Sequence, residues 1–74
     1  IYLKPISYYI EDREKFSFNE ILAASLERGE TAIGIDETDE PFPEEYKINL
    51  NPDRSETFEV TEWTRVVVIA EQEN

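Results

Sequence analysis

Carboxylates make up nearly all of the side chains that could do chemistry in this 74-residue chain. The sequence holds eighteen Asp and Glu residues but no His and no Cys. The missing types exclude Ser-His and Cys-His catalysis, disulfides, and zinc sites built on imidazole or thiolate. Paired acids such as Asp36 with Asp39 would need a pocket that raises one pKa before they could act as acid and base. A chain of this length offers little room for such a pocket, so we expect no enzymatic activity.

The densest group of carboxylates lies in residues 36–45, a segment without hydrophobic periodicity. Ca²⁺ binds about six to eight oxygen ligands, often from one flexible acidic loop. The segment therefore predicts a divalent-cation site, for Ca²⁺ or a similar ion, although it lacks the spacing of an EF-hand. The predicted donors are Asp36, Glu37, Asp39 and Glu40. The alternative is a solvated acidic loop that Pro41 and Pro43 keep extended.

The formal net charge of −11 limits the classes of partner. Such a surface repels nucleic acid and anionic lipid, whereas it attracts cations and basic proteins or serves only to keep the chain dissolved. The longest purely apolar run, residues 66–70, is far shorter than the roughly 20 residues of a membrane span. We therefore expect no nucleic-acid partner and no direct membrane insertion. The absence of any Met indicates a fragment of a longer protein.

Large apolar and aromatic side chains are concentrated in residues 1–10. They are more than one strand with a solvated face can bury, so two interpretations stay open. One is that the rest of a longer protein covers the surplus. The other is a protein–protein interface, where Tyr is enriched, formed by a twofold homodimer. The predicted interface residues are Tyr2, Tyr8, Tyr9 and Ile10. For Trp63 a place in the core is favoured over a place in an interface.

The clearest local signal is a helix over residues 18–28. Ser17 and Glu20 have the spacing of a capping box, and Gly29 is a typical residue just after a helix end. An apolar stripe with helical spacing lies between these signals and consists of Phe18, Ile21, Leu22 and Leu26.

Strand patterns surround this helix. The segments are residues 1–10 at a sheet edge or broken at Pro5, 31–36, 46–50, a very short strand near 58–60, and a central strand at 65–70. Residues 11–15 are predicted to form a charged loop. The predicted fold class is α+β, with one helix packed on a small, mostly antiparallel or mixed sheet of four to five strands. Residues 1–74 form one domain.

Several short segments, taken in order, resemble a known family. They are Ser17–Glu20, Thr31–Ile35, Ile48–Pro52, Arg54–Glu56 and Val66–Ala70. Together they resemble the C-terminal ligand-sensing module of RCK proteins, the regulators of potassium conductance, and most of all its version in Castor/Pollux-type ion channels. The resemblance spans nearly the whole chain. The chain departs from the family pattern in its longer acidic loop and in the turn before the last strand.

This resemblance implies a regulatory domain of a potassium or other cation channel or transporter. Such a domain would lie at the cytoplasmic face of a membrane, in a gating ring, and assemble as a dimer. The parent chain would carry a Rossmann-like RCK core and a transmembrane pore upstream, and any nucleotide site would belong to that core. No cofactor is expected in this domain apart from a divalent cation. The alternative is a stand-alone acidic module for protein interaction or dimerisation.

Overall fold

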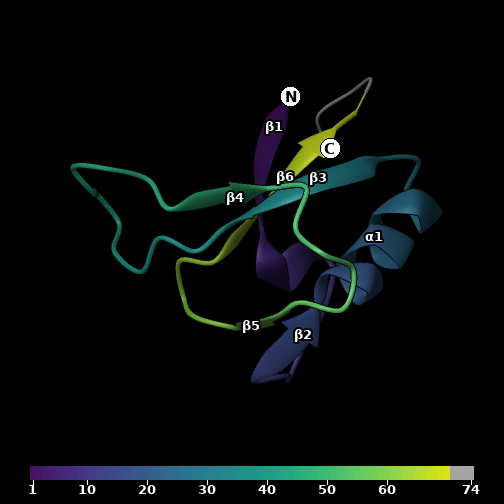
Figure 1. Cartoon of the computed structure of the whole chain (residues 1–74), viewed down its shortest axis with the longest axis horizontal. Helices are drawn as coiled ribbons and strands as arrows, with labels where there is room; N and C mark the ends of the chain where they lie inside the picture. Colours follow the sequence, from purple (N-terminus) through teal and green to yellow (C-terminus); the bar gives the residue numbers. More distant parts are fainter. Residues whose placement is uncertain (71–74) are drawn as a thin grey trace.

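A computed structural model describes residues 1–70 and has an α+β fold, as predicted (Figure 1). Its elements in chain order are β1 (Tyr2–Pro5), the 3-10 helix η1 (Ile6–Tyr8), β2 (Lys15–Ser17), α1 (Phe18–Glu27), β3 (Thr31–Asp36), β4 (Ile48–Leu50), β5 (Thr57–Glu59) and β6 (Arg65–Ile69). Four strands form an antiparallel sheet in the order β1-β6-β3-β4, and β2 pairs with β5 in a separate two-stranded ribbon. The strand over 65–70 is thus interior to the sheet, as expected.

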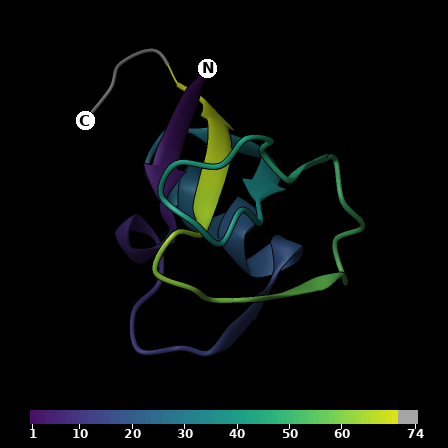
Figure 2. The same ribbon diagram turned by 90° about the vertical axis from the view of Figure 1, so that its left-hand side faces the viewer.

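The helix and the two-stranded ribbon lie on the same side of the four-stranded sheet, below it in Figure 1 (Figures 1 and 2). Their buried side chains join those of one sheet face in a single core. The core consists of Ile6, Phe16, Phe18, Ile21, Ala32, Ile35, Phe58, Val66 and Val68. One face of the sheet is therefore covered, whereas the other has no element of the described chain packed along it.

Helix α1 begins and ends where its capping residues require. The Glu20 amide donates to the Ser17 hydroxyl at 3.3 Å, and the Ser17 amide donates to the Glu20 carboxylate at 3.1 Å, which completes the capping box. Gly29 has a φ of +74°, a left-handed conformation that favours glycine. The observed helix is one residue shorter at its end than predicted.

The first segment is an edge strand that breaks at Pro5, as expected, but a 3-10 helix and not a second extended piece follows the break. The strand ends at Pro5, and η1 follows, because Pro5 cannot continue the ladder. The Ile6 amide then donates to the carbonyl of Thr64 at 3.0 Å, which holds η1 against the turn before β6. Ile6 itself is buried in the core.

The ribbon of β2 and β5 was only half predicted. The short strand near 58–60 is present as β5, but Lys15–Ser17 forms a strand where a charged loop was expected. Phe16 and Phe58 are opposite each other in this ribbon and stack with ring centroids 5.5 Å apart. The loop prediction failed because this strand gains its stability from one distant aromatic partner rather than from a local pattern.

Gly34 lies where the backbones of β3 and β4 approach each other closely. The register between β3 and β6 shifts between Ala32 and Gly34, so a bulge lies there. A Cβ atom at Gly34 would lie 2.7 Å from the carbonyl oxygen of Asn49 in β4. A residue without a Cβ therefore suits both the bulge and the close approach of the β4 backbone.

Candidate functional site

The aromatic residues predicted to form an interface are turned largely toward the chain's own core. Tyr2, Tyr9 and Ile10 are half-buried and pack against the core cluster, and Tyr8 contacts Tyr9 edge to face with centroids 5.0 Å apart. The first segment thus uses much of its apolar surface inside the domain. The interface at these four residues stays a prediction.

A buried ion pair explains the orientation of this segment. Lys4 points inward from β1 and pairs with Glu30, and both side chains are almost wholly buried. The other Glu30 oxygen accepts a hydrogen bond from the Tyr9 hydroxyl at 2.6 Å. The guanidinium of Arg28 lies 4.3 Å from the centre of the Tyr8 ring. This cluster was not predicted, since its two charged partners are 26 residues apart and look like ordinary surface charges.

The electrostatics of this cluster favour a fixed charge state. Burial disfavours the charged form of Glu30, but the hydrogen bonds from Lys4 and Tyr9 outweigh it and lower the pKa of this carboxyl. Burial, and then the hydrogen bond to Glu30, raise the pKa of Tyr9 well above its ordinary value of 10.0. Glu30 is therefore ionised and Tyr9 neutral at neutral pH. A carboxyl held ionised in this way suits a structural role and not that of a general acid.

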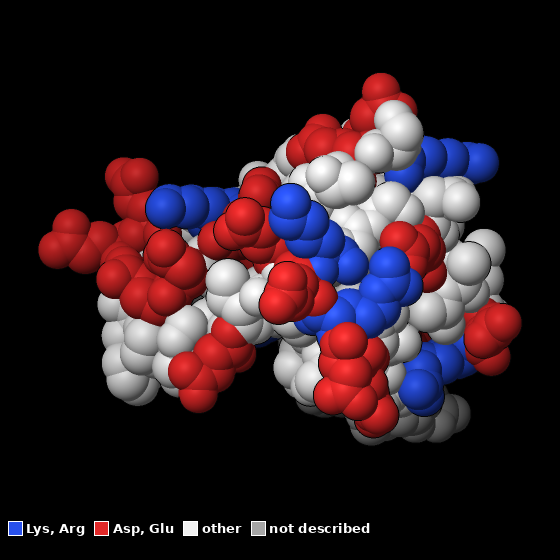
Figure 3. All heavy atoms as spheres, turned by 90° about the horizontal axis from the view of Figure 1, so that it is seen from below, with Lys and Arg blue, Asp and Glu red and all other residues white. Residues whose placement is uncertain are grey.

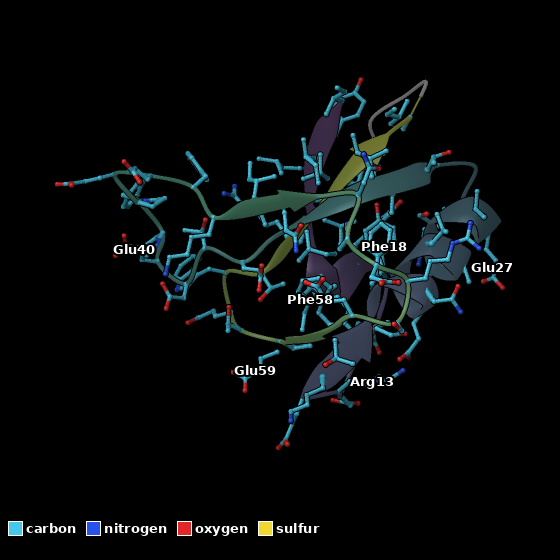
Figure 4. All side chains as sticks on the ribbon, viewed as in Figure 1. Arg13, Phe18, Glu27, Glu40, Phe58 and Glu59 are labelled. Carbon is cyan, nitrogen blue, oxygen red and sulfur yellow. The ribbon has the colours of Figure 1, made fainter. Side chains whose placement is uncertain are left out.

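The four acids predicted to bind a cation do not converge. Asp36 is fully buried at the end of β3, whereas Glu37, Asp39 and Glu40 are exposed. No group of three or more acidic side chains in residues 1–70 has the arrangement of a metal site. The loop projects from the end of the sheet (Figure 4), and its acidic side chains spread along it (Figure 3). The Ca²⁺ site stays a prediction that has no support from this geometry.

Asp36 instead holds the start of the acidic loop, residues 36–45, through hydrogen bonds. One carboxylate oxygen accepts hydrogen bonds from the Arg65 guanidinium at 3.1 and 2.7 Å. The other accepts from the amide of Thr38 at 3.0 Å and from its hydroxyl. The Thr38 hydroxyl in turn accepts from the Lys47 amide at 2.9 Å, and Arg65 lies 5.3 Å from the centre of the Tyr46 ring. Both ends of the loop are thus tied to the sheet.

The sheet face opposite the helix is the best candidate for a functional surface. One row of opposed residues crosses all four strands as Leu3, Val67, Gly34 and Leu50. A second row is formed by Pro5, Arg65, Asp36 and Ile48. Ile69, two residues beyond Val67, extends the same face. We call this surface the outer face and define it by Leu3, Ile48, Leu50, Val67 and Ile69.

The outer face exposes its apolar side chains to an unusual degree. Leu3, Ile48, Leu50 and Ile69 are 42%, 44%, 58% and 51% exposed, with Val67 buried between them. Ile48 and Leu50 belong to the strand predicted over residues 46–50, but their side chains face away from the core. A contiguous apolar patch of this kind is typical of an interaction surface.

Trp63 does not lie in the core, so the favoured prediction for it is wrong. Its side chain is 39% exposed in the turn between β5 and β6. The turn is closed by hydrogen bonds between Thr61 and Thr64: the Thr64 amide donates to the Thr61 carbonyl at 3.3 Å, and the Thr61 amide donates to the Thr64 hydroxyl at 2.9 Å. These bonds bury Thr64 and leave the indole outside.

The stretch Asn51–Glu56, which overlaps two segments of the family resemblance, binds the start of α1. The amides of Phe18 and Asn19, which lack partners inside the helix, donate to the carbonyls of Glu56 and Arg54 at 3.1 and 3.0 Å. Asn51 adopts a φ of +51°, and its amide donates to the Ile33 carbonyl at 2.8 Å. The stretch therefore links β4 to the helix start and has a structural role here.

Comparisons with protein-family models, with curated proteins and with solved structures find no match to this chain. No helix among residues 1–70 combines the length and apolar character needed to cross a membrane. The function is therefore inferred from the outer face and from the pattern of the sequence.

Proposed function

We propose that this chain is a regulatory domain without catalytic activity, which assembles as a homodimer through its outer face. The observation that supports this most directly is the exposure of four large apolar side chains in one patch: Leu3, Ile48, Leu50 and Ile69. An isolated domain gains nothing from such a patch, and a partner surface would remove it from water.

The sequence of β6 supports the same conclusion. Its run Val66-Val67-Val68-Ile69 is apolar without alternation, a pattern typical of strands that are covered on both faces. In this chain α1 and the ribbon cover one face only. A second copy placed on the outer face would supply the missing cover.

The size of the domain is compatible with such a dimer. Specific interfaces bury at least about 1,200 Å² in total, or about 600 Å² from each partner. The accessible surface of one copy is 5136 Å². The outer face would thus need to bury roughly one eighth of that surface, with help from neighbouring loops.

The resemblance to RCK C-terminal modules suggests what the dimer regulates. On this proposal the domain belongs to the gating ring of a potassium or other cation channel or transporter, at the cytoplasmic face of a membrane. Its part in regulation would be to favour one arrangement of the ring over another, by no more than its difference in binding energy between the two. Sequencing the gene upstream of Ile1 should then reveal a Rossmann-like core and hydrophobic spans.

Sedimentation of residues 1–74 over a range of micromolar concentrations tests the assembly. We expect a reversible monomer–dimer equilibrium that Leu50→Glu abolishes, since a carboxylate would have to be buried in the interface. The matched control is Leu26→Glu, because Leu26 is equally exposed, at 57%, but lies on α1. Both variants should keep the circular dichroism of the parent. A monomer at every concentration, or equal effects of the two variants, would refute the proposal.

A second candidate is a stand-alone acidic interaction module, which the loop between β3 and β4 favours. This loop presents Phe42 with 93% of its surface exposed, and its neighbours include several carboxylates. Acidic side chains around an exposed aromatic suit a basic partner with an apolar pocket. A parent gene without hydrophobic spans would favour this candidate over the channel domain.

A further inference from the structure

A small cavity lies at the end of the outer face, where the acidic loop comes close to the turn before β6. Its volume is about 310 Å³. The lining residues are Pro5, Glu40, Pro41, Glu62, Trp63, Thr64 and Arg65. Pro5 and Arg65 are opposite each other in the second row of the outer face, so the cavity is continuous with that surface. Three distant segments of the chain therefore meet here.

Two of the polar side chains that line this cavity, Arg65 and Thr64, already have partners. The Arg65 guanidinium donates two hydrogen bonds to Asp36 and faces the Tyr46 ring, so its charge is neutralised from within the domain. The Thr64 hydroxyl lies 2.9 Å from the hydroxyl of Thr61. These contacts make the floor of the cavity rigid and leave it little capacity to bind an anion.

Two carboxylates at the cavity have no such partner. Glu40 and Glu62 are exposed, and neither forms a hydrogen bond or an ion pair with another side chain among residues 1–70. They come from different elements, the acidic loop and the turn before β6, but line the same cavity. Its unpaired charge is therefore negative.

Trp63 adds an aromatic wall beside these acids. The residue is 39% exposed, and its amide donates to the Thr61 hydroxyl at 3.2 Å within the closed turn. Trp is the best of the aromatic side chains at binding a cation over its ring face. An indole face, two carboxylates and two proline rings form a set that suits a flat or alkylated organic cation and does not suit a small hydrated metal ion.

We propose that this cavity, formed by Trp63, Glu40 and Glu62, binds an alkylguanidinium or alkylammonium group. The group would lie against the indole while its N–H donors reach the carboxylates, and the net charge of −11 would raise its local concentration. The volume is at the small end for ligand sites, near 300 Å³, and fits one such group with a short alkyl stem. This site adjoins the outer face but includes none of the five residues that define it, so it does not require the proposed dimer.

The fluorescence of the single tryptophan can be used to detect binding at this site. Trp63 is the only Trp of the chain, so fluorescence excited at the red edge, where Tyr does not absorb, comes from this cavity alone. The probe is ethylguanidinium chloride, titrated at constant ionic strength, and the control is the neutral isostere N-ethylurea. We expect a saturable change with the cation and none with the urea. The same response to both compounds, or no saturable response to the cation, would overturn the proposal.

Substitutions that leave the fold intact distinguish the effect of these two carboxylates from that of the protein's overall negative charge. Glu40→Gln and Glu62→Gln should each weaken binding about two- to fivefold, the effect of an exposed ion pair, and the double variant about tenfold. Glu27→Gln, on an exposed position of α1, removes the same charge elsewhere and should leave binding unchanged. If Glu27→Gln weakens binding as much as the cavity variants do, the cation is attracted by the overall negative charge and not bound in the cavity, and the proposal is wrong.

One further titration distinguishes the two possible sources of such a group, a side chain of a partner protein and a free small cation. A short peptide with one arginine between apolar residues is compared with ethylguanidinium. Tighter binding of the peptide, lost in Leu50→Glu, would identify a side chain of a partner that also covers the outer face. Equal binding of both probes would identify a free small cation. Both results support the site itself.

Discussion

The two faces of the four-stranded sheet carry similar side chains but have opposite surroundings. On the inner face Ala32, Ile35, Val66 and Val68 are at most 4% exposed beneath α1 and the aromatic ribbon. On the outer face four residues of the same kinds are 42–58% exposed. Within β6, for example, Val68 is fully buried while its neighbour Ile69 is 51% exposed. The difference supports the proposal that a partner covers the outer face, since the domain itself covers only the inner one.

The largest difference in stability is expected between variants of two adjacent residues of β1, one on each face. Lys4→Ala should lower the free energy of unfolding by about 3–5 kcal/mol, because it leaves Glu30 buried without its cation. Leu3→Ala, one residue away on the outer face, should change it by less than about 0.5 kcal/mol. Urea denaturation of both variants measures the difference. Similar losses would mean that the two faces are not distinct in the free domain.

Two isoleucines, one on each face of the sheet, allow the same comparison without a change of charge. Ile35→Ala should cost about 2–5 kcal/mol, since Ile35 is fully buried and its removal leaves a cavity. Ile48→Ala, at a side chain 44% exposed, should cost well under about 1 kcal/mol. Thermal unfolding of dilute samples, in which the proposed dimer would be dissociated, is the measurement. A large loss in Ile48→Ala under those conditions would show that the outer face already packs within the monomer.

Gly34 sharpens the comparison because it lies on the outer face yet tolerates no larger residue. Gly34→Ala should destabilise the domain by about 1–3 kcal/mol, since the new Cβ would meet the Asn49 carbonyl oxygen at 2.7 Å. Hydrogen exchange should show faster opening of β4 than of β1. Unchanged exchange in β4 would contradict the close approach of the two strands.

Lowering the pH should destabilise the fold through Glu30, which is buried on the inner side of the sheet. The pKa of Glu30 is lowered in the folded chain, so its ionised form stabilises the fold above the ordinary value of 4.5. This contribution is lost as the pH falls below 4.5 and through the lower folded pKa. Unfolding followed against pH should therefore show a loss of stability in acid that is reduced in Glu30→Gln. The same acid profile in parent and variant would assign the loss to other carboxyls.

The smallest effect expected concerns salt and the outer face. Two copies that each carry a charge of −11 repel one another, whereas burial of apolar side chains is not weakened by salt. Raising the salt concentration should therefore strengthen the dimer modestly. Sedimentation in low and moderate salt measures this, and a dimer that salt dissociates would point to an interface of ion pairs.

Features of the fold that depend on neighbours in sequence could be predicted. Ser17 with Glu20 and Gly29 set the limits of α1 through local hydrogen bonds and backbone conformation, and the β-branched run at 65–69 indicated a central strand. The strand at Lys15–Ser17 could not be predicted, because its partner is a phenylalanine far along the chain. Local rules give no information about such a contact.

The position of the exposed apolar side chains could not be predicted from the sequence. The sequence indicated a surplus of large apolar residues in residues 1–10, and the interface predicted there at Tyr2, Tyr8, Tyr9 and Ile10 stays a prediction. The buried pair of Lys4 and Glu30 turns that segment inward, and the surplus then appears on the other side of the sheet. Asp36 likewise was interpreted as a cation ligand, since nothing near it in sequence reveals its bond to Arg65.

The most direct test of the account is a dilution series of amide spectra by nuclear magnetic resonance. If the outer face is the assembly surface, resonances that shift with concentration should belong to β1, β4 and β6, with the largest shifts at Leu3, Leu50 and Ile69. Resonances of α1 should stay fixed. Concentration-dependent shifts that cluster at Tyr8 and Tyr9 instead, or no shifts up to millimolar protein, would contradict the central claim.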